Sequence, residues 1–468
     1  MANPSTLGGG QFLVVVGVDS KGVHIPYCKH GCGRDGGYGC SIAKAVEASK
    51  LKSHLDLTYA PSDVIIKDIN LLYDAVKGSR EDFLNKYLDD HISDFNIPEE
   101  YADEFRQILK DGLDNAGFDI NLFGGDPEWY PEVIEVIREL KEDKSRKYIV
   151  NLTTTGSRII TDDEFFQELY SAPLDLLALS IDDTDCLQYF SSSPEEVKRV
   201  YNEYKERCSL EKIKPQGQWM KSMEGLYAAK ILKNKNPDMK VLFNVVIKKQ
   251  NLDNVYDIVT GLNEEFPMAK INPYFAQSFG DEEEPAFREE HLDKLEGFVD
   301  YMLELNKKID TDKPFSPKIH YWIMLKSAFE TWRDDKERLL RGLSGDGIWN
   351  CSRTKGRELY ALATASKNKN VGGPRIIQGC QWDDMVNVEE KGLYDMTVED
   401  VKNHMQNIGE TARNANYSCR GDIMPRITAG NIFSLEAGLS DELKPKYIEI
   451  RNDILKSLLN ERKENASS

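Results

Sequence analysis

Short apolar runs alternate with helical patterns along most of this chain, and this alternation restricts the fold more than any other feature of the sequence. The first run, QFLVVVGV at residues 11–18, is rich in β-branched residues, as are strands that are buried on both faces of a parallel sheet. Further strands are predicted at 118–123, 148–156, 174–182, 239–249 and 269–277, and helices at 41–55, 131–143, 162–170, 194–207, 217–234, 251–262 and 289–309. Strands that are each followed by a helix predict an α/β fold with a parallel sheet, either doubly wound or curled into a barrel.

The chain changes character near residue 312, and this divides it into two predicted parts. Residues 1–311 carry the alternation of strands and helices, with an inserted helical region at 57–116. Residues 312–468 form an extension that is mixed and mainly helical, and it ends in an amphipathic helix at 441–463.

The formal net charge of -19 argues against a broad nucleic-acid or anionic-membrane surface, because both would require basic patches. The sequence has no run of about 18 apolar residues, and residues 1–10 lack the basic and apolar regions of a signal peptide. We therefore expect a cytoplasmic protein without nucleic-acid or membrane partners. In a reducing compartment, cysteines at short spacing are metal ligands or reactive thiols more often than disulfide partners.

Three cysteines lie close together in PYCKHGCGRDGGYGC, which follows the first predicted strand and occupies residues 26–40. Thiolates are soft ligands that suit zinc or an iron-sulfur cluster. A structural zinc usually has four protein ligands, and no fourth cysteine or close histidine pair completes that set near Cys28, Cys32 and Cys40. Three thiolates with one open metal position favour an iron-sulfur cluster, while structural zinc and unligated thiols remain alternatives.

The other five cysteines are scattered without CxxC spacing, and buried inert thiols are the commonest reading of such residues. Three of them differ, because Cys351, Cys380 and Cys419 each lie in a glycine- or asparagine-containing loop of the extension. Two functional readings compete for these three: ligands of an auxiliary cluster, or one thiol that donates a hydrogen atom to a substrate radical.

From Gln11 to about Gln277 the chain resembles the radical S-adenosylmethionine superfamily, which places three cysteines after the first strand and an aromatic residue two positions before the third. Tyr38 and Cys40 match that ending, whereas the segment GRDGGYG between Cys32 and Cys40 is longer than the usual spacing. A second motif follows the second predicted strand, where GGDP at 124–127 is similar to the GGEP of the family.

The resemblance implies a partial (β/α)6 TIM-like barrel with a four-iron four-sulfur (4Fe-4S) cluster held by the three clustered cysteines. The open iron would be chelated by the amino and carboxylate groups of S-adenosylmethionine. The resemblance assigns cofactor contacts to Tyr38 near the adenine, to Gly124, Gly125, Asp126 and Pro127 at the methionine amino group, and to Ser180 and Asn244 at the ribose or carboxylate. For Ser180 and Asn244 a polar cap at a strand end is the alternative, for GGDP an ordinary turn, and for Tyr38 packing over the loop.

In the family, cleavage of the bound cofactor yields a 5'-deoxyadenosyl radical that removes hydrogen from a substrate. The plan of the chain, a barrel and a cysteine-containing extension, is similar to the maturases of ribosomal peptides and most similar to peptide amino-acid epimerases. That implies a peptide substrate with a leader sequence and an electron donor such as flavodoxin or ferredoxin. The alternatives are a peptide maturase that cross-links side chains or excises a residue with a second iron-sulfur cluster, a small-molecule isomerase or dehydrogenase of the same superfamily, and a non-catalytic zinc-binding scaffold.

An epimerase of this kind needs a thiol that returns hydrogen to the substrate from the opposite face. Cys380 is the candidate, because it follows a short apolar strand, RIIQ, and a glycine that lets the chain turn sharply, with Trp382 close in sequence to exclude water. Cys351, beside Trp349, is the second candidate.

Overall fold

A computed structural model gives the structure of the protein. It describes residues 11–14, 17–18, 58–59, 62–82, 102–103, 106–107, 118–122, 127–213, 215–235, 240–249, 251–275, 289–308, 322–323, 325–326, 329–330, 333, 360–362, 376–378, 397–400, 403, 442–445 and 448–449. Within these ranges, no helix is both long enough and apolar enough to cross a membrane.

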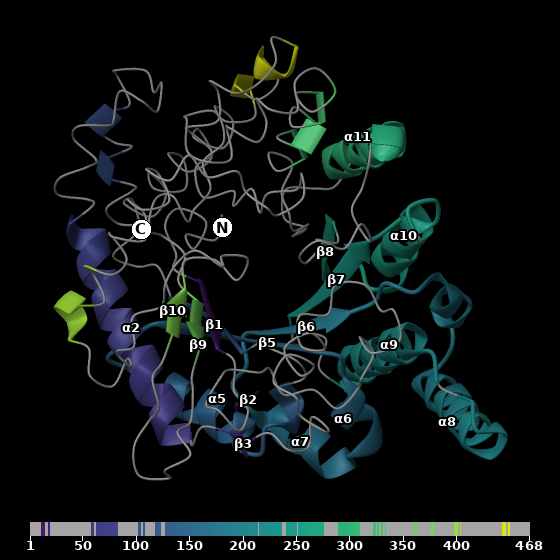
Figure 1. The fold of residues 1–468 in the computed structure, drawn as a ribbon, viewed down its shortest axis with the longest axis horizontal. Coiled ribbons are helices and arrows are strands. Elements are labelled where there is room, and N and C mark those ends of the chain that lie inside the picture. The colour runs from purple at the N-terminus through teal and green to yellow at the C-terminus, as the bar shows by residue number, and fades with distance from the viewer. Residues whose placement is uncertain are drawn as a thin grey trace, which may run out of the picture.

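A six-stranded sheet forms the centre of the described structure (Figure 1). Its strands, in spatial order, are β1 (Gln11–Val14), β4 (Phe118–Leu122), β5 (Tyr148–Thr154), β6 (Leu176–Ser180), β7 (Val241–Ile247) and β8 (Lys270–Phe275). Every neighbouring pair is parallel. The predicted α/β class and all six predicted strands are therefore confirmed, and among the described strands β1 and β8 are the two edges of an open sheet.

The predicted first strand, 11–18, is wrong in its length. β1 ends at Val14, which lies opposite Leu122, the last residue of β4. Among the described residues the parallel pairing of β1 with β4 stops at that point, and β2 (Gly17–Val18) pairs instead with the antiparallel β3 (Thr58–Tyr59). The hydrophobic run is therefore divided between two sheets.

Helices follow the strands as predicted. In chain order they are α2 (Ser62–Asp82), η6 (Pro127–Trp129), α5 (Val133–Glu142), α6 (Ser157–Thr161), α7 (Asp163–Ser171), η7 (Thr184–Tyr189), α8 (Pro194–Glu211), α9 (Gly217–Lys235), α10 (Val255–Glu265), η8 (Glu289–His291) and α11 (Leu292–Lys308), where η marks a 3-10 helix. Figure 1 shows α5, α6, α7, α9 and α10 along one side of the sheet. The predicted helix at 41–55 lies outside the described residues.

The spacing of apolar residues explains why these helices pack on the sheet. In α10 the buried residues Val255, Ile258, Val259 and Leu262 recur at intervals of three and four, so they form one apolar stripe. α9 differs, because it is buried around most of its surface, with α8 on its outer side. Gly225 allows α9 to lie close to the end of β6, since a Cβ atom there would stand 3.0 Å from the backbone oxygen of Ser180.

α2, from the predicted inserted region, packs against α5 and the start of β5. The backbone N–H of Ser62 donates to Glu132 at 2.6 Å, and the hydroxyl of Tyr148 donates to Asn70 at 2.7 Å. The guanidinium of Arg146 forms an ion pair with Asp74 at 3.0 Å. The insertion therefore contributes a helix to the same layer as the helices that follow the strands.

The first described residues of the extension share the core of the sheet domain. Trp322 is fully buried and meets the ring of Phe298 in α11 edge to face, with 5.9 Å between ring centroids. Lys326 pairs with Asp300 at 2.6 Å. The division at residue 311 falls between described segments and stays a prediction, but these contacts attach the start of the extension to α11.

The predicted strand RIIQ is confirmed as β10 (Ile376–Gln378), which pairs in an antiparallel manner with β9 (Tyr360–Leu362). β9 contacts β1, and Figure 1 shows the two-stranded ribbon beside that edge of the main sheet. A strand pair of the extension therefore lies next to β1, the first strand of the main sheet.

Candidate functional site

The two faces of the sheet differ in chemistry. Paired residues in a parallel sheet point to the same face, and successive residues of one strand alternate between faces. One face carries apolar side chains that are buried almost completely, among them Ile120, Val150, Leu152, Leu177, Leu179, Phe243, Val245 and Ile271. This face is turned towards the helices, since the ring of Phe243 packs on that of Phe266, at the end of α10, with 5.0 Å between centroids.

The opposite face is mixed, with apolar residues such as Ala178, Leu242 and Val246 among uncharged polar ones. It carries Asn121, Asn151, Thr153, Ser180, Asn244 and Asn272 on five successive strands. Ser180 lies opposite Asn244, which lies opposite Asn272, and the amide of Asn272 donates to that of Asn244 at 3.0 Å. On the other half of the sheet, the hydroxyl of Thr153 donates to Asn121 at 2.8 Å. We call these six polar residues the polar face; their hydroxyl and amide groups are suited to a ligand with many hydrogen-bonding atoms.

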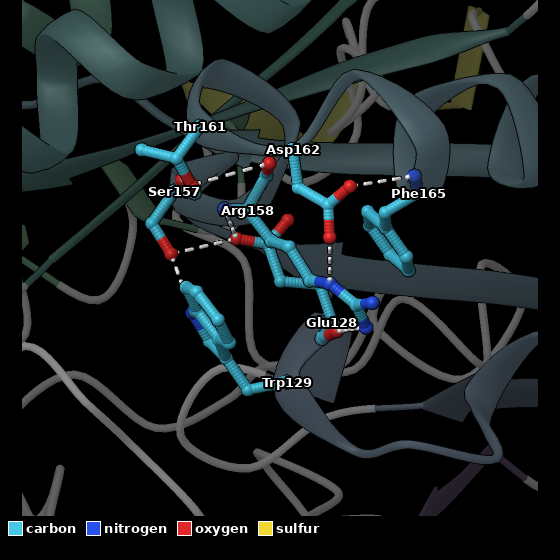
Figure 2. A network of polar contacts seen from close by, with 7 residues as sticks. All are labelled: Glu128, Trp129, Ser157, Arg158, Thr161, Asp162 and Phe165. Carbon is cyan, nitrogen blue, oxygen red and sulfur yellow. Dashed lines mark hydrogen bonds and ion pairs between the residues drawn. The ribbon is translucent and has the colours of Figure 1, made fainter.

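A network of polar contacts fixes the chain directly after the GGDP motif (Figure 2). Glu128 in η6 is fully buried, and its Oε1 accepts hydrogen bonds from the hydroxyl of Ser157 at 2.7 Å and the backbone N–H of Arg158 at 2.5 Å. The indole N–H of Trp129 donates to the Ser157 hydroxyl at 2.7 Å. Two consecutive residues after β4 are thereby joined to the start of α6, after β5.

Arg158 extends this network to α7. Its Nη1 donates to the backbone oxygen of Glu128 at 3.0 Å, and its Nε pairs with Asp162 at 3.0 Å. The guanidinium carbon lies 4.0 Å from the ring centroid of Phe165, within the range of a cation–π contact. Asp162 is also the N-cap of α7 and accepts from the backbone N–H of Phe165 at 2.9 Å. These contacts hold the pKa of the Asp162 carboxyl below its usual value, with the Phe165 hydrogen bond as the largest cause.

A second charged cluster lies just beyond the end of β6. The side chain of Asp182 is only 1% exposed and is placed 3.4 Å from the ammonium group of Lys248 and 3.7 Å from that of Lys221. Burial by itself would raise the pKa of the Asp182 carboxyl, but the two lysines outweigh burial and hold this pKa below its usual value. The amide of Asn251 donates to the backbone oxygen of Asp182 at 3.0 Å, which fixes the turn after Ser180.

The structure places three of the residues predicted at the site. Pro127 is buried at the start of η6, Ser180 is the last residue of β6, and Asn244 lies in the middle of β7. Ser180 and Asn244 lie opposite each other in neighbouring strands, and Asn244 is within β7 rather than at its end, which excludes a cap at a strand end for Asn244. Their assignment to a cofactor stays a prediction. The other predicted site residues lie outside the described residues: Cys28, Cys32, Tyr38, Cys40, Gly124, Gly125, Asp126, Cys351, Cys380 and Cys419.

Sequence reasoning missed Glu128 and Asp182. Each follows a predicted site residue closely, since Glu128 is next to Pro127 and Asp182 is two positions beyond Ser180. The closeness of each carboxylate to a predicted site residue was the only signal in the sequence. The burial of each carboxylate could not be predicted, because it depends on partners that are distant in sequence. No group of three or more His, Cys, Asp or Glu side chains suited to a metal ion occurs among the described residues.

No family model and no curated protein matches this chain. Several solved structures match this chain with low sequence identity and low TM-scores. Native anSMEcpe with bound AdoMet is 14% identical, with a TM-score of 0.42 over 96% of this chain and 98% of that chain. Native anSMEcpe with bound AdoMet and Cp18Cys peptide is 14% identical, with a TM-score of 0.40 over 74% and 90%. Streptococcus suis SuiB bound to the precursor peptide SuiA is 12% identical, with a TM-score of 0.38 over 87% and 67%. At TM-scores this low, the likenesses add nothing to the assignment of fold or activity.

Proposed function

We propose that this protein is a cytoplasmic radical S-adenosylmethionine enzyme that modifies a ribosomally made peptide. The observation that carries the proposal is the pairing of the two strands that precede the motifs. β1, followed by the short β2, precedes the three-cysteine motif, and β4 directly precedes GGDP; β1 and β4 are parallel neighbours. In parallel α/β sheets, ligands bind at the carboxyl ends of the strands.

The donor groups of the chain fit this pair of cofactors. Cys28, Cys32 and Cys40 supply three thiolates, the ligand type of an iron-sulfur cluster, and leave one iron for S-adenosylmethionine. Ser180 and Asn244 supply a hydroxyl and an amide from adjacent positions on the polar face, which suits a ribose or a carboxylate. When bound, the two cofactors would supply the chemistry that removes a hydrogen atom from a C–H bond of the substrate.

Gly124 to Pro127 would present backbone groups to the amino group of the cofactor, and Tyr38 would lie near its adenine. The substrate proposed is a peptide with a leader sequence, and the electron donor is of the flavodoxin or ferredoxin type. The outcome proposed is epimerisation of an L-residue, in which Cys380, or in second place Cys351, returns hydrogen from the opposite face. β10 ends two residues before Cys380, and its partner β9 contacts β1, which supports a position of Cys380 near the site.

The first experiment tests the cofactors. Protein purified without oxygen is expected to be brown, to contain iron and to release 5'-deoxyadenosine from S-adenosylmethionine after reduction. Replacing Cys28, Cys32 and Cys40 together by Ala should remove most of the iron and all of the cleavage, because the ligands are lost. Cys208→Ala, a buried cysteine in α8, is the control and should keep both. A colourless wild-type protein that contains zinc would favour a structural metal site and contradict the proposal.

The second experiment tests the outcome of the reaction. The enzyme would be co-expressed with precursor peptides in deuterium oxide, and products would be read by mass spectrometry and chiral amino-acid analysis. Cys380→Ala is expected to cleave S-adenosylmethionine but to yield no D-residue and no deuterium at the α-carbon. Wild-type amounts of a deuterated D-residue would exclude Cys380 as the donor. Loss of iron beyond that of one cluster in the same variant would instead indicate a second cluster, as in a cross-linking or excising maturase.

A further inference from the structure

Glu128 is a buried charged residue that the proposed chemistry does not use. It is fully buried, and a carboxylate in that position is costly unless it is hydrogen-bonded. Its Oε1 receives two donors, the Ser157 hydroxyl and the Arg158 backbone N–H. Both donors belong to the first two residues of α6, so the side chain connects the end of one strand–helix loop to the next.

Two further contacts reinforce the same connection. Trp129 donates to Ser157, and the guanidinium of Arg158 donates to the backbone oxygen of Glu128. With the two bonds to Oε1, four hydrogen bonds join residues 128 and 129 to residues 157 and 158. Each joins η6, which follows β4, to the start of α6, which follows β5 (Figure 2).

The turn that receives Glu128 is itself fixed. Gly156 has a φ of 86°, which favours glycine, and a Cβ atom there would stand 2.9 Å from the backbone oxygen of Glu224 in α9. The hydroxyl of Thr154 accepts from the backbone N–H of Gly156 at 3.2 Å, and that of Thr155 accepts from Ser157 at 3.3 Å. Glu128 is therefore tied to a turn that α9 and local hydrogen bonds hold in place.

We propose that Glu128 is the positioning residue of the GGDP motif. The motif lies between two fixed points, since Leu122 is held in β4 and Glu128 is held by α6. Two glycines give a chain many accessible conformations. A segment that must become ordered when its ligand binds lowers the affinity for that ligand, because the ordering costs free energy. Fixing both ends of the motif reduces that loss. Glu128 acts through the backbone and does not touch the ligand.

This inference rests on the proposed function, because it assigns GGDP to the amino group of S-adenosylmethionine. A role of Glu128 in stability alone makes a different prediction. In that case a variant would unfold more readily, but each folded molecule would bind S-adenosylmethionine as the wild type does. Affinity measured on folded, iron-loaded protein therefore separates the two roles.

The test compares Glu128→Ala, Glu128→Gln and the control Glu164→Ala, which removes an exposed glutamate from the first turn of α7. Affinity for S-adenosylmethionine would be measured by calorimetry on anaerobic protein, with iron content and circular dichroism recorded for each variant. Glu128→Ala is expected to keep its iron and to raise Kd about tenfold, because it removes the acceptor of two hydrogen bonds. Glu128→Gln keeps a carbonyl oxygen as acceptor and should stay within about threefold of wild type. Glu164→Ala should bind as wild type does.

Hydrogen exchange supplies a measurement that needs no ligand. In cofactor-free protein, peptides that cover residues 118–130 should exchange faster in Glu128→Ala than in wild type, while peptides of α10 should be unchanged. If Glu128→Ala does not fold, Trp129→Phe removes the donor to Ser157 while keeping an aromatic ring, and it should raise Kd about threefold.

A folded Glu128→Ala that binds S-adenosylmethionine with the wild-type Kd would overturn the inference, as would unchanged affinity in Trp129→Phe where that variant stands in. Wild-type protein that binds neither iron nor S-adenosylmethionine would overturn the proposed function instead. In that event faster exchange at 118–130 would still show that Glu128 fixes the segment, so the two failures are distinguishable.

Discussion

Asp182→Asn is expected to destabilise the protein by about 3 kcal/mol at neutral pH. Asparagine has nearly the same shape as aspartate, so the change removes the charge and leaves the packing almost unaltered. The ammonium groups of Lys248 and Lys221 lie 3.4 and 3.7 Å from the carboxylate, and their side chains are 13% and 18% exposed. In Asp182→Asn the ammonium groups of Lys248 and Lys221 stay near the end of the sheet and lose this carboxylate as a partner.

The magnitude follows from two opposing contributions. At an effective dielectric constant of about 20, each of the two contacts is worth roughly 4–5 kcal/mol of attraction. Burying the carboxylate costs several kcal/mol and offsets much of that attraction. Because removal of one partner of a buried ion pair typically costs about 3–5 kcal/mol, and because both lysines keep some access to water, we expect the low end of that range.

The pH dependence gives the sharper result. The folded-state pKa of Asp182 is lowered, so its stabilising contribution is present above the unfolded-state pKa of about 3.9 and is lost as the pH falls through the folded-state value. A protonated aspartic acid resembles asparagine in charge. The difference in the free energy of unfolding between wild type and Asp182→Asn should therefore be largest at neutral pH and should shrink below about pH 4.

Urea unfolding followed by tryptophan fluorescence measures these free energies at pH 7 and at a series of pH values below about 4. The control is Asp185→Asn, an exposed aspartate three positions further on, which should change stability by less than about 0.5 kcal/mol. Combining Asp182→Asn with Lys248→Met should recover part of the loss, because it removes one of the two like charges. If Asp182→Asn were no less stable than Asp185→Asn, the ion-pair reasoning would be refuted.

Three further changes test other parts of the structure. Gly156→Ala should lower the free energy of unfolding by about 2–4 kcal/mol, because it places a methyl group at a positive-φ position and against the backbone of Glu224. Urea titration measures this loss, and a variant as stable as wild type would show that the turn rearranges easily. Tyr201→Phe should cost about 2 kcal/mol in the same assay, because the buried carboxylate of Glu224 loses a donor at 2.5 Å, and an unchanged midpoint would argue against that bond. Gly125→Val should keep the iron but weaken S-adenosylmethionine binding, because a β-branched side chain obstructs approach to the backbone; equal affinity in a titration would remove GGDP from the site.

The sequence was sufficient for the class of fold, because each strand is an apolar, β-branched run with a helical pattern behind it. The strand predicted at 239–249 appears as Val241–Ile247, and the error lies at its ends, where a flanking residue such as Lys248 is compatible with strand or turn. The break in the predicted strand 11–18 could not be foreseen. It depends on where β4 ends and on pairing with Thr58–Tyr59, which are contacts between distant parts of the chain.

The site was predictable to the extent that it follows strand order. Ser180 and Asn244 were placed on the fourth and fifth strands of the sheet, and the parallel register brings them opposite each other. Glu128 was not predictable, because a glutamate after proline in a turn is usually solvated, and its burial results from contacts about 30 positions away. Asp182 was missed for the same reason, since both of its lysine partners come from later elements.

The order of the strands also bears on how the protein is made. In the main sheet the spatial order β1-β4-β5-β6-β7-β8 repeats the order along the chain, so each strand pairs only with the strands that precede and follow it in that sheet. As a ribosome releases the chain, each new strand and helix finds its partner already synthesised, and the sheet can grow by one unit at a time. Long excursions between pairing strands, which slow folding, occur at the step from β1 to β4 and at the step from β6 to β7, where η7, α8 and α9 intervene. The final strand, β8, completes a sheet whose other five strands have already left the ribosome.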